Sequence, residues 1–172
     1  MTSTPRPRST RIRPVEQRRP RRTAGRAALA LVAVLAASCS EHSVGPARTY
    51  DDYERKSRTS AEVALSAVET VRLLAETSSD GNAWGAYTSV SLSEQEDTLA
   101  EAEGDYSSIQ PPDHRSDDLR VKLLDLLGTA GDHIAAVRIE ARRGNLDSLE
   151  QVARPLADDS AALQQFLDSI KR

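Results

Sequence analysis

Apolar side chains recur three and four residues apart along most of the chain beyond residue 50, and this spacing constrains the fold most strongly. In an α-helix such positions share one face, whereas a half-buried strand needs apolar residues at every second position. Four stripes of this kind are separated by turn-forming segments, and no stretch shows a convincing strand alternation. The sequence therefore predicts an all-α protein with four amphipathic helices.

The first two predicted helices span residues 50–77 and 83–108. The first ends in the segment SSDGN, because Gly81 readily adopts a left-handed cap conformation. Pro111 and Pro112 stop the second. The first apolar stripe consists of Ala61, Ala64, Leu65, Val68, Val71, Leu74 and Ala75. The second consists of Thr88, Leu92, Gln95, Leu99, Ala102, Tyr106 and Ile109.

The third predicted helix spans residues 113–143, with Asp113 or Ser116 as its first residue. Gly128 and Gly131 lie in the middle of it, where they either allow close contact with another helix or divide the helix in two. We expect one continuous helix. Its stripe consists of Leu119, Leu123, Leu126, Ala130, Ile134, Val137 and Ala141.

The fourth predicted helix spans residues 146–170 and follows Gly144, a natural stop for the third. Asn145 is a plausible N-cap for it. Pro155 removes one backbone donor and is expected to kink the helix without ending it, because the stripe keeps its phase. The stripe consists of Leu146, Leu149, Ala153, Leu156, Ser160, Leu163, Leu167 and Ile170.

Four amphipathic helices joined by short connections favour an antiparallel up-down-up-down four-helix bundle. We assign residues 50–172 to this bundle. Residues 39–49 are polar and contain Gly45-Pro46, so we expect a flexible tether before the first helix.

Residues 1–38 differ from the rest of the chain. Nine arginines and one glutamate lie in the first 26 residues, and an unbroken apolar run follows from Ala27 to Ala37. As a helix this run would be roughly 16 Å long, well short of the roughly 30 Å hydrocarbon core of a membrane. A basic segment followed by a short apolar segment and small residues is typical of an export signal, here residues 1–38.

The end of the apolar run, LAASC, resembles the lipobox of bacterial lipoproteins, in which small residues precede a cysteine that is lipidated. The resemblance implies cleavage before Cys39, acylation of its sulfur and attachment to the extracytoplasmic face of the cell membrane. The leucine usual three residues before the cysteine is replaced by Ala36. Simple secretion, an uncleaved anchor and an organellar transit peptide remain alternatives, as does twin-arginine export at Arg21-Arg22.

The charge of the predicted mature chain excludes one class of partner. Removing nine arginines and one glutamate from totals of 23 and 26 leaves 14 basic and 25 acidic residues, a net charge of −11. Such a domain repels nucleic acid and anionic lipid headgroups, so we expect no nucleic-acid binding. Cys39 is the only cysteine, so no disulfide can form within the chain.

Motifs for cofactors, metals and catalysis are missing from the sequence. His114 and His133 lie on one predicted helix, roughly 28 Å apart, and cannot hold one haem together. The chain contains neither Glu-x-x-His pairs nor a G-x-S-x-G motif. Asp132 adjoins His133, but neighbouring helical residues point about 100° apart and do not pair. We therefore predict no cofactor, no metal and no catalytic residue.

The remaining candidates are residues for partner contact. Trp84 and Tyr87 lie near the first connection. They either form an exposed recognition patch or cover the end of the bundle core, and we favour the second alternative. Asp113, His114 and Arg115 follow the double proline, at the end expected to carry the tether.

The predicted function is that of a lipid-anchored, extracytoplasmic helical bundle with a non-enzymatic binding, scaffold or envelope role. The alternative is an exported bundle that binds a small ligand or metal where Gly128, Gly131 and Pro155 disturb packing.

Overall fold

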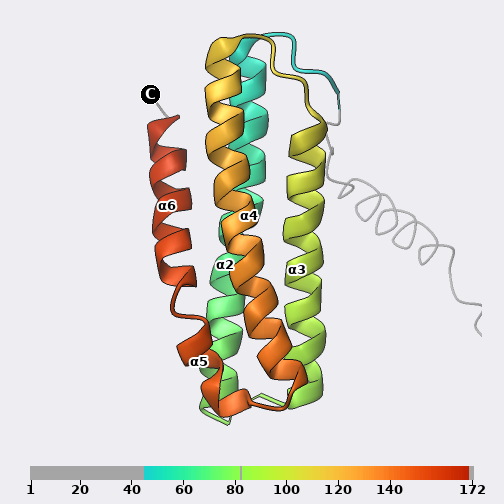
Figure 1. Ribbon diagram of the computed structural model, residues 1–172, viewed down its shortest axis with the longest axis vertical. Helices are drawn as coiled ribbons and strands as arrows, with labels where there is room; N and C mark the ends of the chain where they lie inside the picture. Colours follow the sequence, from blue (N-terminus) through green and yellow to red (C-terminus); the bar gives the residue numbers. More distant parts are fainter. Residues whose placement is uncertain (1–44, 82, 171–172) are drawn as a thin grey trace, which may run out of the picture. The chain divides into compact units, whose positions relative to one another are not determined.

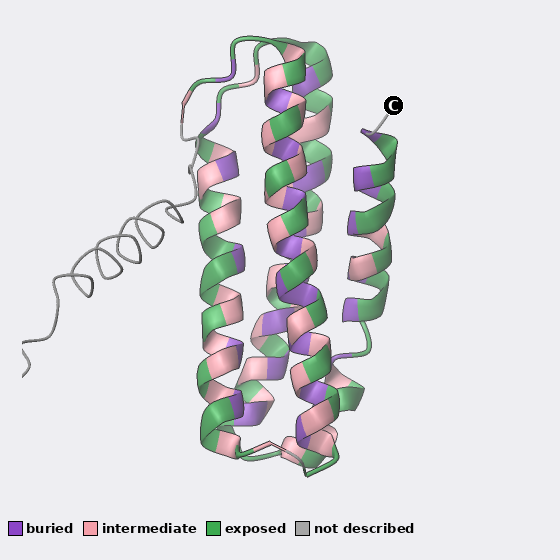
Figure 2. Ribbon diagram, turned by 180° about the vertical axis from the view of Figure 1, so that it is seen from behind, coloured by how far each residue is buried: buried purple, intermediate pink, exposed green. Residues whose placement is uncertain are grey.

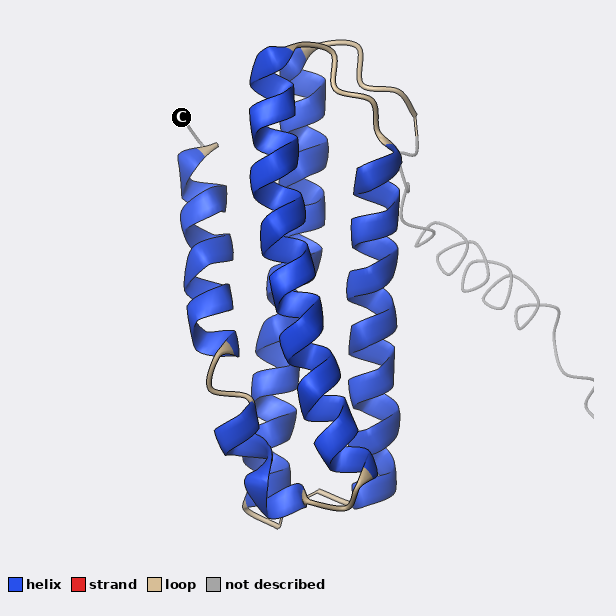
Figure 3. Ribbon diagram, viewed as in Figure 1, coloured by secondary structure: helices blue, strands red, loops and turns tan. Residues whose placement is uncertain are grey.

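A computed structural model of the protein describes residues 45–81 and 83–170, and the predicted all-α class is confirmed for them (Figures 1 and 3). No strand occurs in these two ranges. The helices pack against one another as a single compact unit. They are α2 (Tyr50–Ser79), α3 (Gly85–Ser108), α4 (His114–Arg142), the 3-10 turn η1 (Leu146–Ser148), α5 (Leu149–Val152) and α6 (Leu156–Ser169).

The helices α2 and α4 lie in the middle of the unit. Each packs against the other and against both α3 and α6. Figure 1 shows α3 and α6 on opposite sides of this pair. The chain reverses direction between α2 and α3, between α3 and α4 and between α4 and α5, and α6 continues in the direction of α5. Figure 2 shows the buried positions turned toward the interior, so one core runs along the helices.

The helix α2 forms the core surface predicted for it. Its stripe residues Ala61, Ala64, Val68, Val71 and Ala75 are all fully buried. These small side chains share one core with the buried leucines of α4, Leu123 and Leu127. At the N-terminus of α2 the Thr49 side chain accepts a hydrogen bond from the Asp52 amide, and at the other end Gly81 has a φ of 73°, the predicted left-handed conformation.

Two further helices follow the sequence prediction closely. In α3, Leu92, Leu99 and Tyr106 are buried, as predicted. The α4 helix runs uninterrupted through both of its central glycines, which confirms the single third helix. A Cβ added at Gly128 would meet nothing within 4 Å, and one at Gly131 would meet only Leu99 at an ordinary 3.8 Å. Neither glycine therefore marks an unusually close helix contact.

The expected continuous fourth helix is wrong. The chain forms η1 and α5, turns through residues 153–155, and resumes as α6. Pro155 has no amide proton to donate to the Gln151 carbonyl, and the amides of Leu156 and Ala157 bond only three residues back. Asn145 occupies the predicted N-cap position, before η1, but its side chain makes no capping bond and donates instead to Glu140.

A polar cluster lies inside the core near the start of α2. The Ser57 hydroxyl lies 2.9 Å from the Tyr106 hydroxyl and donates to the Tyr53 carbonyl. The rings of Tyr53 and Tyr106 pack at 5.6 Å between centroids. Burial raises the pKa of the Tyr106 phenol well above its usual range, so this hydroxyl stays protonated.

The segment before α2 lies partly against the bundle. The Gly45 carbonyl accepts a hydrogen bond of 2.9 Å from the Lys56 ammonium, and Ala47 is buried. The predicted signal peptide and Cys39 lie outside the described residues, as does the first half of the predicted tether. Within the part of the chain that the structure describes, no helix is both long and apolar enough to span a bilayer.

Candidate functional site

Three exposed large apolar side chains lie at the connection between α2 and α3 and in the first turns of α3, and Trp84 is the most exposed large apolar side chain of the described residues. Trp84 is 87% exposed, Tyr87 62% and Val90 59%. The favoured expectation that Trp84 and Tyr87 cover the end of the core is therefore wrong. Together these three residues, hereafter the α3 tip, expose two aromatic side chains and one aliphatic side chain to solvent.

The local packing explains why these aromatic side chains point outward. The buried Thr88 hydroxyl lies 2.8 Å from the Ser78 hydroxyl of α2 and also bonds the Trp84 carbonyl, which fixes the rotation of the first turn of α3. A Cβ on Gly85 would lie 3.3 Å from the Leu146 side chain, tighter than an ordinary contact. Residues 85 and 88 thus occupy the inward positions, and the aromatic residues cannot.

The second group of candidates lies at the other end of α3. Asp113 is the N-cap of α4, and its carboxylate accepts hydrogen bonds from the Ser116 amide at 2.9 Å and hydroxyl at 2.7 Å. The hydroxyl and amide of Ser116 lower the pKa of the Asp113 carboxyl. The Arg115 guanidinium lies 3.8 Å from the centre of the Tyr50 ring, which places this connection beside the start of α2, as expected. His114 is fully exposed, near Asp117.

His133 has a partner that sequence reasoning missed. Its Nδ1 lies 2.7 Å from a carboxylate oxygen of Asp159, a buried residue of α6, and not beside the adjacent Asp132. Asp159 lies three residues after Leu156 and four before Leu163, both buried, so helical spacing already pointed it inward. The pair links α4 to α6 across the bundle.

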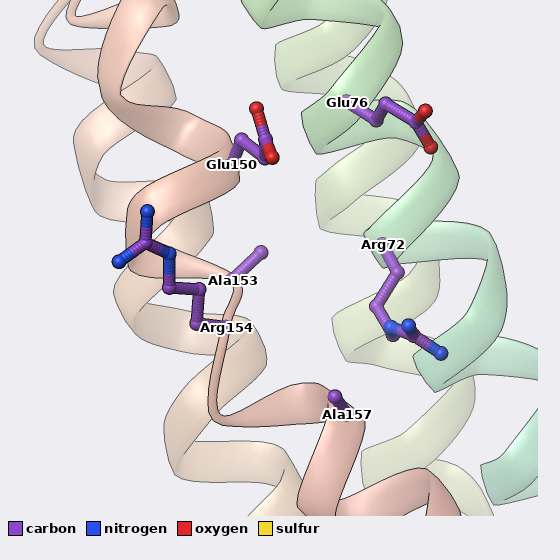
Figure 4. Close-up of a pocket in the computed structure, with 6 residues that line it drawn as sticks. All are labelled: Arg72, Glu76, Glu150, Ala153, Arg154 and Ala157. Atoms are coloured by element: carbon purple, nitrogen blue, oxygen red, sulfur yellow. The ribbon is translucent and has the colours of Figure 1, made fainter.

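A cavity of about 210 Å³ lies where the chain breaks between α5 and α6 (Figure 4). It faces α2 and is lined by Arg72, Glu76, Glu150, Ala153, Arg154 and Ala157. The cavity lies beside Pro155, where a disturbance of packing was expected, but Pro155, Gly128 and Gly131 are not among its lining residues. Sequence reasoning missed the lining residues because the cavity lies at a break in the fourth helix, which was predicted to be continuous.

The described residues contain no cluster of side chains suited to bind a metal ion. No group of three or more His, Cys, Asp or Glu side chains within residues 45–81 and 83–170 is placed to hold an ion. Arg138 pairs with Glu96 between α4 and α3, and such pairs connect helices without forming a reaction centre.

Comparisons with known proteins return no match. Neither a protein-family model, nor a curated protein, nor a solved structure matches the chain.

Proposed function

We propose that this protein is a lipid-anchored, extracytoplasmic helical bundle with a non-enzymatic binding or scaffold role in the cell envelope, and that the α3 tip contacts its partner. The observation that carries the proposal is the 87% exposure of Trp84. Tryptophan and tyrosine dominate the binding energy of many protein interfaces, and soluble proteins seldom leave them together in water.

The architecture we propose is an up-down-up-down four-helix bundle in which the fourth helix is broken into η1, α5 and α6. Alternating chain direction in Figure 1 supports it. In this topology the start of α2 and the α3–α4 connection share one end, and the α3 tip lies at the other.

The export signal and Cys39 give the bundle its orientation in this proposal. Five residues separate Cys39 from Gly45, whose carbonyl is bonded to Lys56 of α2. An acylated Cys39 therefore holds the start of α2 near the membrane. The 30 residues of α2 separate the α3 tip from the start of α2 by roughly 45 Å. A surface at that distance suits a protein partner and not the lipid to which the chain is anchored.

The partner contact is tested by crosslinking in intact cells that express the full chain. Trp84→Ala combined with Tyr87→Ala is expected to remove a stoichiometric crosslinked complex seen with the unchanged protein, because it truncates both aromatic anchors. Val121→Ala is the matched control, since Val121 is an exposed apolar residue of α4, 71% exposed. Equal loss in both variants, or no loss in either, contradicts the assignment of the α3 tip.

A second candidate function, small-ligand binding, is favoured by the cavity at the break between α5 and α6. Its lining combines two carboxylates and two guanidinium groups with two alanines. Small-molecule sites are concave, and a few polar or charged groups in them orient the ligand.

A further inference from the structure

The exposed face of α3 continues from the α3 tip into a row of acidic residues. Glu94, Asp97 and Glu101 follow Val90 at spacings of four, three and four residues, so they lie on the same side of the helix. All three acidic residues are exposed. These three residues, hereafter the acidic stripe, extend the face of the α3 tip along the helix. From Trp84 to Glu101 this face is roughly 26 Å long.

The acidic stripe is turned away from the cations of the neighbouring helix α4. Figures 1 and 2 show α3 at one side of the unit, where it packs against α2 and α4. Toward α4, Ser93 accepts a hydrogen bond of 3.3 Å from Arg142, and Glu96 pairs with Arg138. The carboxylates of the acidic stripe form no ion pair in the part of the chain that the structure describes. Their charges therefore face solvent.

The stability of α3 does not account for the acidic stripe. The helix contains six acidic residues and neither lysine nor arginine. On α2, by contrast, Asp52, Glu54 and Glu69 each lie within 4.0 Å of an arginine three or four residues away. Like charges at these spacings repel each other along a helix, and an acidic residue in the last turn, such as Asp105, opposes the helix dipole. We therefore look for a role of these charges in binding.

The charge of this face selects the class of partner. The predicted mature chain has a net charge of −11, which repels nucleic acid and anionic lipid headgroups. A symmetric contact between two copies would place two acidic stripes in one interface, where they repel each other. A basic polypeptide is attracted to the stripe, and its apolar side chains can cover the α3 tip. Lysine and arginine also pack favourably over the ring of an exposed tryptophan such as Trp84.

We propose that the α3 tip and the acidic stripe form one docking surface for a basic segment of a partner protein. Apolar side chains of that segment cover the α3 tip, and its lysine or arginine side chains pair with the acidic stripe. Successive carboxylates of the stripe lie about 5 Å apart along α3, which cations on successive turns of a partner helix match. The inference rests on the proposed partner contact of the α3 tip and adds the charge of the partner.

The test uses the protein purified in detergent and a synthetic helical peptide of about 18 residues, long enough to follow the whole face. One side of the peptide carries leucines in one half and lysines in the other, and the peptide titrated into detergent alone is the blank. Trp84 is the only tryptophan of the chain, so its fluorescence reports binding at the α3 tip. We expect a saturable blue shift of its emission. Binding should weaken at least about tenfold between about 0.1 M and 1 M salt, because salt screens exposed charges.

Neutralising the acidic stripe separates its charge from the net charge of the protein. The stripe variant is Glu94→Gln with Asp97→Asn and Glu101→Gln. It is expected to bind the peptide about tenfold more weakly, because three surface ion pairs are lost together. The matched control, which makes the same change in net charge at exposed positions of α2, α4 and α6, is Glu62→Gln with Asp125→Asn and Asp158→Asn. This control is expected to bind normally, and an unchanged melting temperature reports an intact fold in both variants.

Several results overturn the inference without removing the α3 tip as a contact surface. If the matched control weakens binding as much as the stripe variant does, net charge explains the binding. If a peptide with glutamate in place of lysine binds equally well, apolar contact alone explains it. If the protein without peptide sediments as a dimer that Trp84→Ala with Tyr87→Ala abolishes, the face docks a second copy.

The proposed partner contact itself is judged by a different measurement. If the lysine peptide leaves the Trp84 emission unchanged, the basic segment is wrong. The partner contact still stands if Trp84→Ala with Tyr87→Ala removes the crosslinked complex in cells. It fails if that complex persists in this double variant.

Discussion

At the scale of single residues, side-chain environment decides role more than residue type does. Asp113 and Asp159 are both aspartates near the N-terminus of a helix, but Asp113 caps α4 at the surface and Asp159 is buried against His133. The start of α4 near Asp113 was predictable to within a few residues, because aspartate is a favoured residue at a helix N-terminus. The pairing of Asp159 with His133 was not predictable, because it joins residues 26 apart through the packing of α6 on α4.

Replacing Asp159 by alanine is expected to destabilise the protein by about 1.5–3 kcal/mol, because it removes a hydrogen bond to a buried carboxylate and leaves His133 without its partner. Asp158→Ala is the matched control at an exposed neighbour and is expected to change stability by less than about 0.5 kcal/mol. Urea unfolding of both variants measures the difference. Equal effects contradict a structural role for the pair.

We predict that the stabilisation of α4 by its N-cap Asp113 depends on pH. Its pKa is lowered in the folded state by Ser116, so its contribution to stability is present above the unfolded pKa and is lost as pH falls through the folded one. The stability difference between the unchanged protein and Asp113→Ala should therefore be constant near neutral pH and shrink below about pH 4. Urea unfolding at pH 7, 5 and 3 measures it. A difference that grows toward low pH contradicts this assignment.

At the scale of elements, apolar spacing predicted which faces are buried better than where helices end. The stripe over residues 146–170 keeps its phase across Pro155, and Leu149, Leu156 and Leu163 are all buried. An apolar stripe of this kind is compatible with one kinked helix and equally with two separate helices, because in both cases each half buries its own apolar face. The break follows from the missing amide proton of Pro155. The spacing of apolar residues gives no information about this backbone hydrogen bond.

Pro155→Ala restores that donor and is expected to extend α5 toward α6. The added helical bond should slow amide exchange at residues 153–157, with local opening costing about 1 kcal/mol more. Hydrogen exchange resolved by residue measures it, and Ala161→Gly, at an exposed position of α6, shows the effect of a change outside the break. Unchanged exchange at 153–157 means that packing against α2, and not the proline, sets the break.

At the scale of the whole molecule, the all-helical unit was predictable from its stripes, whereas its exposed surfaces were not. The outward direction of Trp84 and Tyr87 depends on Gly85 packing against Leu146, a contact between segments about 60 residues apart. The cavity likewise depends on the register of α2 against the break. Features formed between elements are set by tertiary packing, which a single sequence does not display.

The central proposal is that an acidic helical bundle is held outside the cell by a lipid on Cys39. Intact-mass analysis of the protein extracted from membranes tests it most directly. We expect the mass of residues 39–172 with acyl chains attached, and a Cys39→Ser variant that is neither acylated nor retained in the membrane fraction. Recovery of an unacylated chain that still carries residues 1–38, from the cytosol, would contradict the proposal.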